Sequence, residues 1–282
     1  MVAFLGMGLL GSNFVRAMIN KGGQVQVWNR THSKATALEQ YGAKAFADVA
    51  DAVRGASVVH LTLKDDATVD EVLAKAAAGL MPGATIIDHT TTSVQGAIDR
   101  TKEWAAKGFS YLHAPVFMGP PNALDGTGTM LVSGDQAVIA RVESALAKMT
   151  GKVLNFGNAV GKAAGMKLLG NLFLMTLTGG LADTLAFAKT VDIRLEEIFM
   201  LFDTWNPAGM VPNRLKRMTS GSYSSPSWEL SMARKDARLM MEEAGEGTLM
   251  FIPAIAAKMD TFIAGGHGSD DWTVIAKDSI PR

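Results

Sequence analysis

The chain has 282 residues, which is long enough for about two domains with sizeable cores. Its 27 basic and 27 acidic side chains balance, so neither a nucleic acid nor a membrane surface is expected as a partner. The chain contains no cysteine, which excludes disulfides, iron–sulfur clusters and thiol catalysis. A reducing cytoplasm fits this composition and is the location that we expect.

The apolar segments predict neither a signal peptide nor a membrane span. The first residues, MVAFLGMGLLGSN, carry no basic stretch ahead of the apolar run. The longest apolar candidate, residues 168–182, is free of charge for only 15 residues, whereas a membrane span needs about 20. We therefore expect a buried helix of a soluble protein over this stretch.

Short β-rich runs alternate with helical stretches through the first part of the chain. Strands are predicted at residues 2–5, 25–29, 44–47, 57–63 and 84–90, and helices at 12–21, 33–41, 49–54 and 70–80. This alternation predicts an α/β fold, with a parallel, doubly wound sheet and right-handed crossovers.

The pattern changes near residue 160. Strands at 111–117, 129–134 and 153–157 and a helix at 135–149 complete the first part, and long helical stretches follow at 162–189, 195–204, 208–219, 227–244 and 251–264. We therefore predict two domains, an α/β domain over residues 1–160 and an all-α domain over residues 161–282.

A GxGxxG motif, Gly6-Met7-Gly8-Leu9-Leu10-Gly11, directly follows the first strand and opens a helix. In this context the first glycine permits a tight turn, the second lets the backbone approach a pyrophosphate, and the third permits close helix–strand packing. The helix N-terminus adds free N–H groups and partial positive charge. The motif therefore predicts a Rossmann domain that binds a dinucleotide through residues 6–11.

The end of the second strand favours NADP over NAD. A carboxylate that grips the ribose 2′-hydroxyl of NAD is expected there, but Asn29 occupies the position, followed by Arg30 and Thr31, with Lys34 three residues on. A guanidinium and a hydroxyl suit a 2′-phosphate. Leu63, at the end of the strand over 57–63, is a further candidate cofactor contact.

Lys167 stands in an otherwise apolar helical stretch, GKAAGMKLLGNLFLM over residues 161–175. An unpaired buried ammonium costs several kcal/mol, so a lysine there requires a partner, a route to solvent or a chemical role. Asn171 follows at i+4, on the same face of the helix. Together the ammonium and the amide would hydrogen-bond a substrate carbonyl oxygen as hydride reaches its carbon.

These segments resemble the β-hydroxyacid dehydrogenases, the group of 3-hydroxyisobutyrate dehydrogenase and the glyoxylate/succinic semialdehyde reductases. The resemblance spans essentially the whole chain and is carried by FLGMGLLGSN with VWNRT, IIDHTTTS, APVFMG with GTMLVSGD, and GKAAGMKLLGN; ARKDARLMMEEA matches more weakly. It implies that residues 1–160 form a Rossmann domain that binds NADP and that residues 161–282 form an all-α domain for substrate binding and oligomerisation, the two joined by a long helix. It also implies a homodimer or homotetramer, a small carbonyl substrate, and Lys167 as catalytic general acid/base beside Asn171.

The resemblance also implies roles for five other residues. Thr91 matches a threonine near nicotinamide and substrate, and Gly119 matches the last glycine of a loop whose N–H groups bind the substrate carboxylate. Lys235 matches a cofactor-side lysine and Asp236 its neighbour in the cleft. Trp228 stands where the family commonly has a pocket-lining phenylalanine, although core packing explains it equally well.

The substrate loop departs from the family pattern Asp-Ala-Pro-Val-Ser-Gly-Gly. Here it reads His-Ala-Pro-Val-Phe-Met-Gly, so Phe117 replaces the serine and Met118 replaces a glycine. A substrate carboxylate would lose a donor and meet an aromatic ring, a loss of about 1–3 kcal/mol. We therefore expect a more apolar pocket, suited to aldehydes, ketones or bulkier oxo-acids.

Two alternatives to a carbonyl reductase stay open. Imine reductases share the implied fold; they commonly replace the lysine, so Lys167 favours carbonyl chemistry, while Phe117 and Met118 keep imines open. A cofactor-binding protein without turnover is the other alternative, against which the Lys167–Asn171 pair argues. No metal site is expected, because the five histidines are scattered: His32, His60, His89, His113 and His267.

Overall fold

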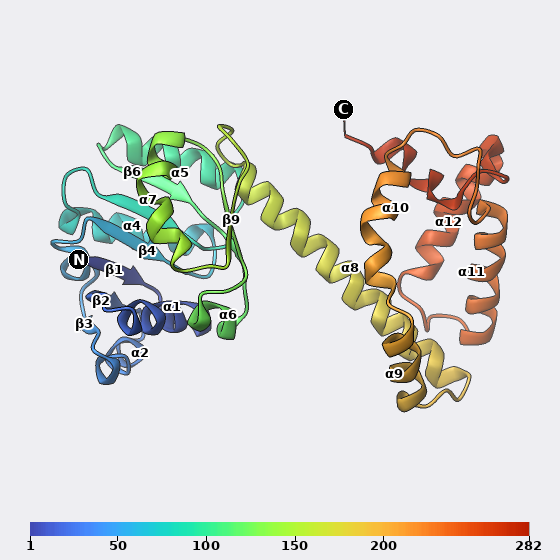
Figure 1. Ribbon diagram of the computed structural model, residues 1–282, viewed down its shortest axis with the longest axis horizontal. Coiled ribbons are helices and arrows are strands. Elements are labelled where there is room, and N and C mark those ends of the chain that lie inside the picture. The colour runs from blue at the N-terminus through green and yellow to red at the C-terminus, as the bar shows by residue number, and fades with distance from the viewer. Residues whose placement is uncertain (282) are drawn as a thin grey trace. The chain divides into compact units, whose positions relative to one another are not determined.

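A computed structural model describes residues 1–281, and the chain divides into two compact units, Met1–Leu172 and Phe173–Arg282. The strands lie in the first unit, and the second is built from helices (Figure 1). Helix α8, Lys162–Thr190, begins where the strand pattern ends and passes through the division between the units. The predicted domain boundary at residues 160/161 therefore marks the end of the α/β pattern, whereas the division between the two compact units falls inside α8.

Six strands of the first unit form one parallel sheet in the order β3-β2-β1-β4-β5-β6, which confirms the predicted doubly wound Rossmann fold. Their bounds are β1 Val2–Leu5, β2 Val25–Trp28, β3 Lys44–Phe46, β4 Val58–Leu61, β5 Thr85–Asp88 and β6 Ser110–His113. The order reverses between β1 and β4, and ligands bind beyond the carboxyl ends of the strands at such a point.

Two hydrophobic cores lie on opposite faces of this sheet. Because side chains alternate along a strand, Phe4 of β1 enters one core while Ala3 and Leu5 enter the other. The Phe4 side is covered by α1 and α7, and the Leu5 side by α3, α4 and α5. The helices of this unit are α1 Leu9–Asn20, α2 His32–Thr36, α3 Val49–Val53, α4 Asp66–Ala76, α5 Val94–Ala106, α6 Pro120–Asp125 and α7 Gln136–Ala147.

A second sheet of three strands follows, in the order β7-β8-β9. Its strands are β7 Val116–Phe117, β8 Thr129–Val132 and β9 Lys152–Asn155, with β7 antiparallel and β9 parallel to β8. The prediction of one strand over residues 111–117 is therefore wrong. Pro115 lies in the break between β6 and β7, where proline removes a backbone donor, and the chain leaves the large sheet there.

The second unit consists of the C-terminal part of α8 and four further α-helices: α9 Leu195–Thr204, α10 Val211–Met218, α11 Leu230–Ala244 and α12 Ile252–Phe262. The predicted helix over 208–219 is a 3₁₀ turn, Pro207–Met210, followed by α10. The segment Ile263–His267 continues α12 as a π-helix, and Trp272–Ser279 forms a 3₁₀ helix that the sequence did not predict. A small core holds α11, α12 and this last helix together.

The prediction of a buried helix over residues 168–182 is wrong for the single chain. Leu169, Leu172 and Met175 of α8 are 60%, 67% and 73% exposed. By length and composition α8 would suffice to cross a membrane, yet Lys167 and Asp183 lie within it, and Asp183 accepts backbone N–H groups of residues 250–252 in the second unit. An apolar helix that its own chain leaves uncovered requires another surface against it.

Two buried histidines lie side by side at the large sheet: His60 belongs to β4, and His89 directly follows β5. His89 Nδ1 donates to the Ala114 carbonyl at 2.8 Å, and His89 Nε2 lies 2.9 Å from His60 Nδ1. The two rings stack on one another and on Phe4. Burial lowers the pKa of His89 to about 4, and burial together with His89 holds the pKa of His60 well below its usual range. The pair is therefore neutral at pH 7.

This pair makes the folded chain sensitive to acid. In the unfolded chain both imidazoles take up protons near pH 6.5, whereas the folded chain resists protonation of His89 down to about pH 4. The contribution of this pair to the free energy of unfolding is therefore fully present above about pH 6.5 and is lost as the pH falls toward 4. The part that comes from His89 is at most about 3 kcal/mol.

We expect the melting temperature of the wild type to fall between pH 7 and pH 4.5. The variant His60→Leu/His89→Leu should be less stable at pH 7, because Ala114 O loses its donor, but should show a flatter fall with pH. His32→Gln, which changes an exposed histidine, is the matched control and should keep the wild-type slope. An unchanged slope in the double variant would contradict the assignment.

Candidate active site

The glycine loop between β1 and α1 has the backbone that the motif predicts. Gly6 has a φ of +98°, and a Cβ there would lie 2.1 Å from the Thr62 carbonyl oxygen. A Cβ on Gly11 would lie 2.0 Å from Gly6 O, so the start of α1 packs directly on the strand end. Around Gly8, by contrast, the described residues place no atom within 4 Å of such a Cβ. The loop is tight on its protein side and open where a pyrophosphate would approach.

Asn29 ties this loop to the end of β2. Its Oδ1 accepts the N–H of Met7 at 2.9 Å, and its Nδ2 donates to the Thr31 carbonyl at 2.9 Å. Both ends of the amide are thus used within the protein. Asn29 therefore shapes the site and leaves the exposed Arg30 and Thr31 to meet a ligand.

A pocket of about 290 Å³ lies at this edge of the sheet. Of the residues predicted to bind the cofactor, those that line it are Gly6, Gly8, Asn29, Arg30, Thr31, Lys34 and Leu63. Met7, Leu9, Leu10 and Gly11 belong to the loop and the first turn of α1 beside it. The convergence follows from the fold, because the segments after β1, β2 and β4 meet at the carboxyl edge of a parallel sheet.

Beyond Leu63, the sequence analysis missed the charged residues that the segment after β4 and helix α4 contribute to this pocket. Lys64, Glu71 and Lys75 also line it. Glu71 accepts from Lys75 at 2.6 Å, and this hydrogen bond, together with the charges of Lys75 and Arg30, lowers the pKa of Glu71. The lining is therefore predominantly cationic. Lys64 was recognisable in the sequence, since it directly follows a predicted strand at the ligand-binding edge.

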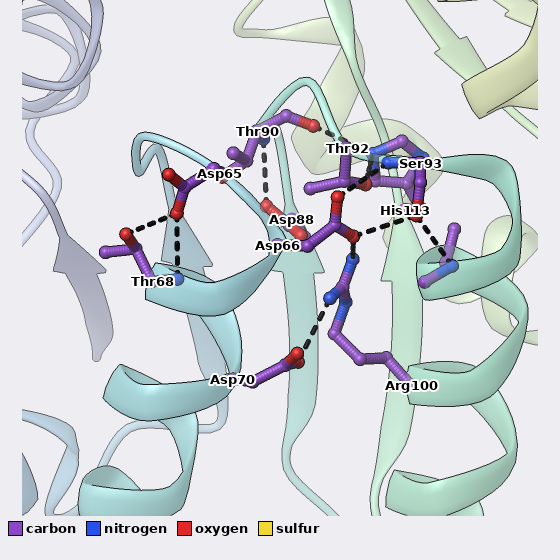
Figure 2. A network of polar contacts seen from close by, with 12 residues as sticks. Asp65, Asp66, Thr68, Asp70, Asp88, Thr90, Thr92, Ser93, Arg100 and His113 are labelled. Atoms are coloured by element: carbon purple, nitrogen blue, oxygen red, sulfur yellow. Dashed lines mark hydrogen bonds and ion pairs between the residues drawn. The ribbon is translucent and has the colours of Figure 1, made fainter.

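The loop after β5 presents Thr91 to solvent between two buried threonines. Thr90 Oγ1 accepts the N–H of Leu63 at 2.9 Å, and the Thr90 N–H donates to Asp88 at 2.8 Å. Thr92 contacts His113 Nε2 at 3.2 Å. Figure 2 shows the Thr90–Asp88 hydrogen bond and, beside it, Thr92 and His113. The backbone on either side of Thr91 is thereby fixed, while its own side chain stays exposed.

A buried arginine connects this loop to α4 (Figure 2). Arg100 of α5 pairs with Asp66 and, at 3.0 Å, with Asp70, both on α4. Its Nε donates to Tyr111, whose hydroxyl donates to Asp88 at 2.6 Å. Asp66 in turn accepts the N–H of Ser93 at 2.9 Å. The network therefore holds the segments after β4 and β5 in one arrangement.

Lys167 and Asn171 point together, as their spacing predicts. Lys167 Nζ donates to Asn171 Oδ1 at 3.0 Å, and the half-buried ammonium lies 4.2 Å from the centre of the Phe117 ring. Burial lowers the pKa of Lys167. The structure thus brings Phe117, Lys167 and Asn171 into one cluster within the first unit.

The loop over residues 113–119, which the resemblance assigns to substrate binding, uses one of its expected donors within the protein. The N–H of Gly119, expected to bind a carboxylate, donates to Asn122 Oδ1 at 2.9 Å. Met118 is partly buried against the Phe4-side core. Asn122, which the sequence analysis did not single out, therefore occupies a donor that the resemblance assigned to a substrate.

Three predicted residues belong to the second unit. Lys235 and Asp236 of α11 pair with one another, with Nζ 2.8 Å from Oδ1, and both are partly exposed. Trp228 packs edge-on against Trp272 at 5.4 Å between ring centres and is 38% exposed. Trp228 thus contributes to packing in its own unit. That it also lines a substrate pocket stays a prediction.

Comparison with known proteins relates the chain to one family of oxidoreductases. Residues 1–157 match the NAD binding domain of 6-phosphogluconate dehydrogenase. An uncharacterized oxidoreductase of Shewanella frigidimarina is 29% identical over 86% of this chain and 84% of its own length. A probable 3-hydroxyisobutyrate dehydrogenase of Mycobacterium bovis is 24% identical over 98% of this chain and 92% of that protein.

A solved structure shares the fold at low sequence identity. The imine reductase from Myxococcus stipitatus in complex with NADP+ superposes with a TM-score of 0.90, at 22% identity, over 98% of this chain and 99% of that one. With the glycine loop, the sheet order and the sequence match over residues 1–157, the chain belongs to the family of the 6-phosphogluconate dehydrogenase NAD-binding domain, within the β-hydroxyacid dehydrogenases, which are pyridine-nucleotide-dependent oxidoreductases.

Proposed function

We propose that this chain is an NADP-dependent reductase that transfers hydride between NADPH and a carbonyl/alcohol pair, with Lys167 as general acid/base. The observation that carries the proposal is the half-buried Lys167 ammonium, which donates to Asn171 Oδ1 at 3.0 Å. The dinucleotide, when bound, supplies the hydride. The residues of the chain bind and orient the reactants and hold the proton.

Lys167 acts on the carbonyl oxygen. Negative charge develops on this oxygen as hydride reaches the carbon, and an ammonium beside it stabilises the charge and donates the proton. Because burial lowers the pKa of Lys167, proton donation is easier near neutral pH than for an exposed lysine. Asn171 restrains the ammonium, and in the oxidative direction the neutral amine of Lys167 accepts the proton.

The preference for NADP rests on charge. Arg30, Lys34, Lys64 and Lys75 line the pocket, and Glu71, its acidic residue, is engaged by Lys75. A 2′-phosphate gains from such a lining, whereas the 2′-hydroxyl of NAD lacks the carboxylate acceptor that usually binds it. The complex of the similar imine reductase with NADP+ supports the same cofactor.

The substrate is proposed to be an aldehyde, a ketone or a bulky oxo-acid. Phe117 and Met118 present apolar groups where a small hydroxy acid requires donors, and the Gly119 N–H already donates to Asn122. Reduction of imines is the second candidate, favoured by the apolar loop and by the similarity in fold to the imine reductase.

The chain is proposed to act as a homodimer or homotetramer. The apolar side chains along α8 are exposed in the single chain, including Leu169, Leu172 and Met175. A second copy would cover them, and the charges of Lys167 and Asp183 within α8 favour a protein partner over lipid. Apolar side chains of α9, such as Phe199 and Met200, extend the uncovered surface.

Lys167→Ala should reduce NADPH oxidation at least about 100-fold, because the proton donor and the stabilising charge are both lost. Turnover would be measured over apolar aldehydes and ketones, glyoxylate, and a cyclic imine with its matching ketone. Lys162→Ala, which removes an exposed lysine from the same helix, should retain wild-type rates. Unchanged turnover in Lys167→Ala removes the assigned role, and a clear preference for glyoxylate removes the apolar substrate class.

Arg30→Asp should lower the ratio of kcat/KM for NADPH to that for NADH at least about tenfold, because a hydrogen-bonded cation is replaced by a repelling carboxylate. Arg54→Asp changes an exposed arginine outside the pocket and should leave the ratio unaltered. Steady-state kinetics with each cofactor gives the result, and an equal ratio in Arg30→Asp and wild type would rule out the phosphate contact.

The wild type should sediment as a dimer or tetramer, whereas Leu169→Glu/Met175→Glu should shift toward the monomer, because two buried carboxylates oppose association. Tyr41→Glu places the same charge at an exposed position of the first unit and should sediment as wild type. A wild type that is monomeric at micromolar concentration would contradict the proposal, provided that its circular dichroism matches a folded chain.

A further inference from the structure

The ring of Phe117 occupies the space of a missing side chain on α8. A Cβ built on Gly170 would lie 2.2 Å from Cζ and 2.7 Å from Cε1 of this ring. No alanine fits there unless the ring moves. A glycine inside a helix is unfavourable relative to alanine, so its presence indicates a requirement for space at this point.

The same ring contacts the ammonium of Lys167, three residues earlier on the helix. The distance from Nζ to the ring centre is 4.2 Å, within the range in which the negative face of an aromatic ring attracts a cation. Among residues 1–281, no carboxylate oxygen lies within ion-pair distance of Lys167. The ring and Asn171 Oδ1 are therefore the contacts that favour the charged amine.

Phe117 is held firmly enough to act on Lys167. Its backbone belongs to β7 and pairs with Thr129 of β8. A Cβ on Gly128 would lie 2.9 Å from Phe117 O, so the neighbouring strand packs closely on this segment. The ring thus reaches α8 from a fixed strand and does not depend on a mobile loop tip.

We propose that Phe117 is a positioning residue for Lys167, that Gly170 provides the space which admits its ring, and that the two together direct the ammonium toward the substrate. An ammonium carries three N–H donors. One donates to Asn171 and the ring covers a second direction, so one donor remains for the substrate oxygen. The inference rests on the proposed function, because it assigns Lys167 as the proton donor. Phe117, which stands where the family pattern has a serine, thereby has a role in this chain that the serine would not have.

The test measures the ionisation of Lys167 directly and does not require a known substrate. Competitive acylation of the purified full chain with acetic anhydride, read by mass spectrometry, gives the pH at which Lys167 becomes reactive. Phe117→Leu keeps apolar volume but removes the aromatic face, so the charged amine loses its attraction and Lys167 should become reactive at a lower pH than in the wild type. Phe109→Leu removes a ring that packs on Trp104 instead of Lys167; it is the matched control and should titrate as the wild type does.

The role of Gly170 is tested by a double-mutant cycle. Gly170→Ala alone displaces the ring, and Phe117→Leu alone removes it. Each should lower kcat for carbonyl reduction about two- to thirtyfold when it is measured at a pH above the midpoint of the wild-type Lys167 acylation profile. In the Phe117→Leu background, where Cζ and Cε1 are absent, Gly170→Ala should add no further loss. Gly165→Ala is the matched control on the same helix and should behave as wild type, since within 4 Å its Cβ would meet, among residues 1–281, only Val94, at 3.7 Å.

The inference is overturned if Lys167 in Phe117→Leu becomes reactive at the wild-type pH or above it, or if Gly170→Ala has the same effect in both backgrounds. If Gly170→Ala does not fold, the comparison of Phe117→Leu with Phe109→Leu decides the question. Failure of the proposed function is a separate result: turnover would then survive in Lys167→Ala, whatever the acylation profile of the wild type.

Discussion

A positive charge on an apolar helix is the constraint around which this site is arranged. Lys167 is half-buried, and within residues 1–281 no carboxylate pairs with it. Its charged form depends on Asn171 Oδ1 at 3.0 Å and on the face of Phe117 at 4.2 Å. These two contacts offset the cost of desolvating the ammonium only in part, so the pKa of Lys167 is lowered. Its ammonium therefore gives up a proton more readily than that of an exposed lysine or of one paired with a carboxylate.

The carboxyl edge of the large sheet, where we propose that the cofactor binds, depends on the strand topology and on polar contacts between loops. The large sheet is parallel, so the segments after β1, β2, β4 and β5 end at one edge. Polar contacts then fix their shapes: Asn29 holds the glycine loop, and Arg100 joins α4 to the segment after β5 through Asp66 and Asp70. Cationic side chains remain free of these structural contacts at Arg30 and Lys34, where a phosphate would gain most from them.

The loop over residues 113–119 departs from the family pattern, whereas the Lys167–Asn171 pair on α8 matches it. Phe117 replaces a hydroxyl with a ring, and Asn122 takes the N–H of Gly119. Both changes remove donors from a region where a carboxylate would require them. Lys167 and Asn171 are unaltered beside this loop. The proton-transfer pair that we propose, Lys167 and Asn171, therefore lies beside an apolar side chain, and this is the reason that we propose carbonyl groups on less polar molecules as substrates.

The sequence alone determined the parallel α/β fold, the glycine loop and the pairing of Lys167 with Asn171, because strand alternation, GxGxxG and i,i+4 spacing act over short distances. It did not reveal Lys64 and Lys75 beside the pocket, the Asn122 contact, or the Phe117 ring over Gly170, since these join segments far apart in the chain. It also predicted a buried helix over 168–182, whereas the single chain leaves that surface exposed. Composition shows that a segment is apolar; only the tertiary structure decides which surface covers it, because burial depends on the packing of distant segments.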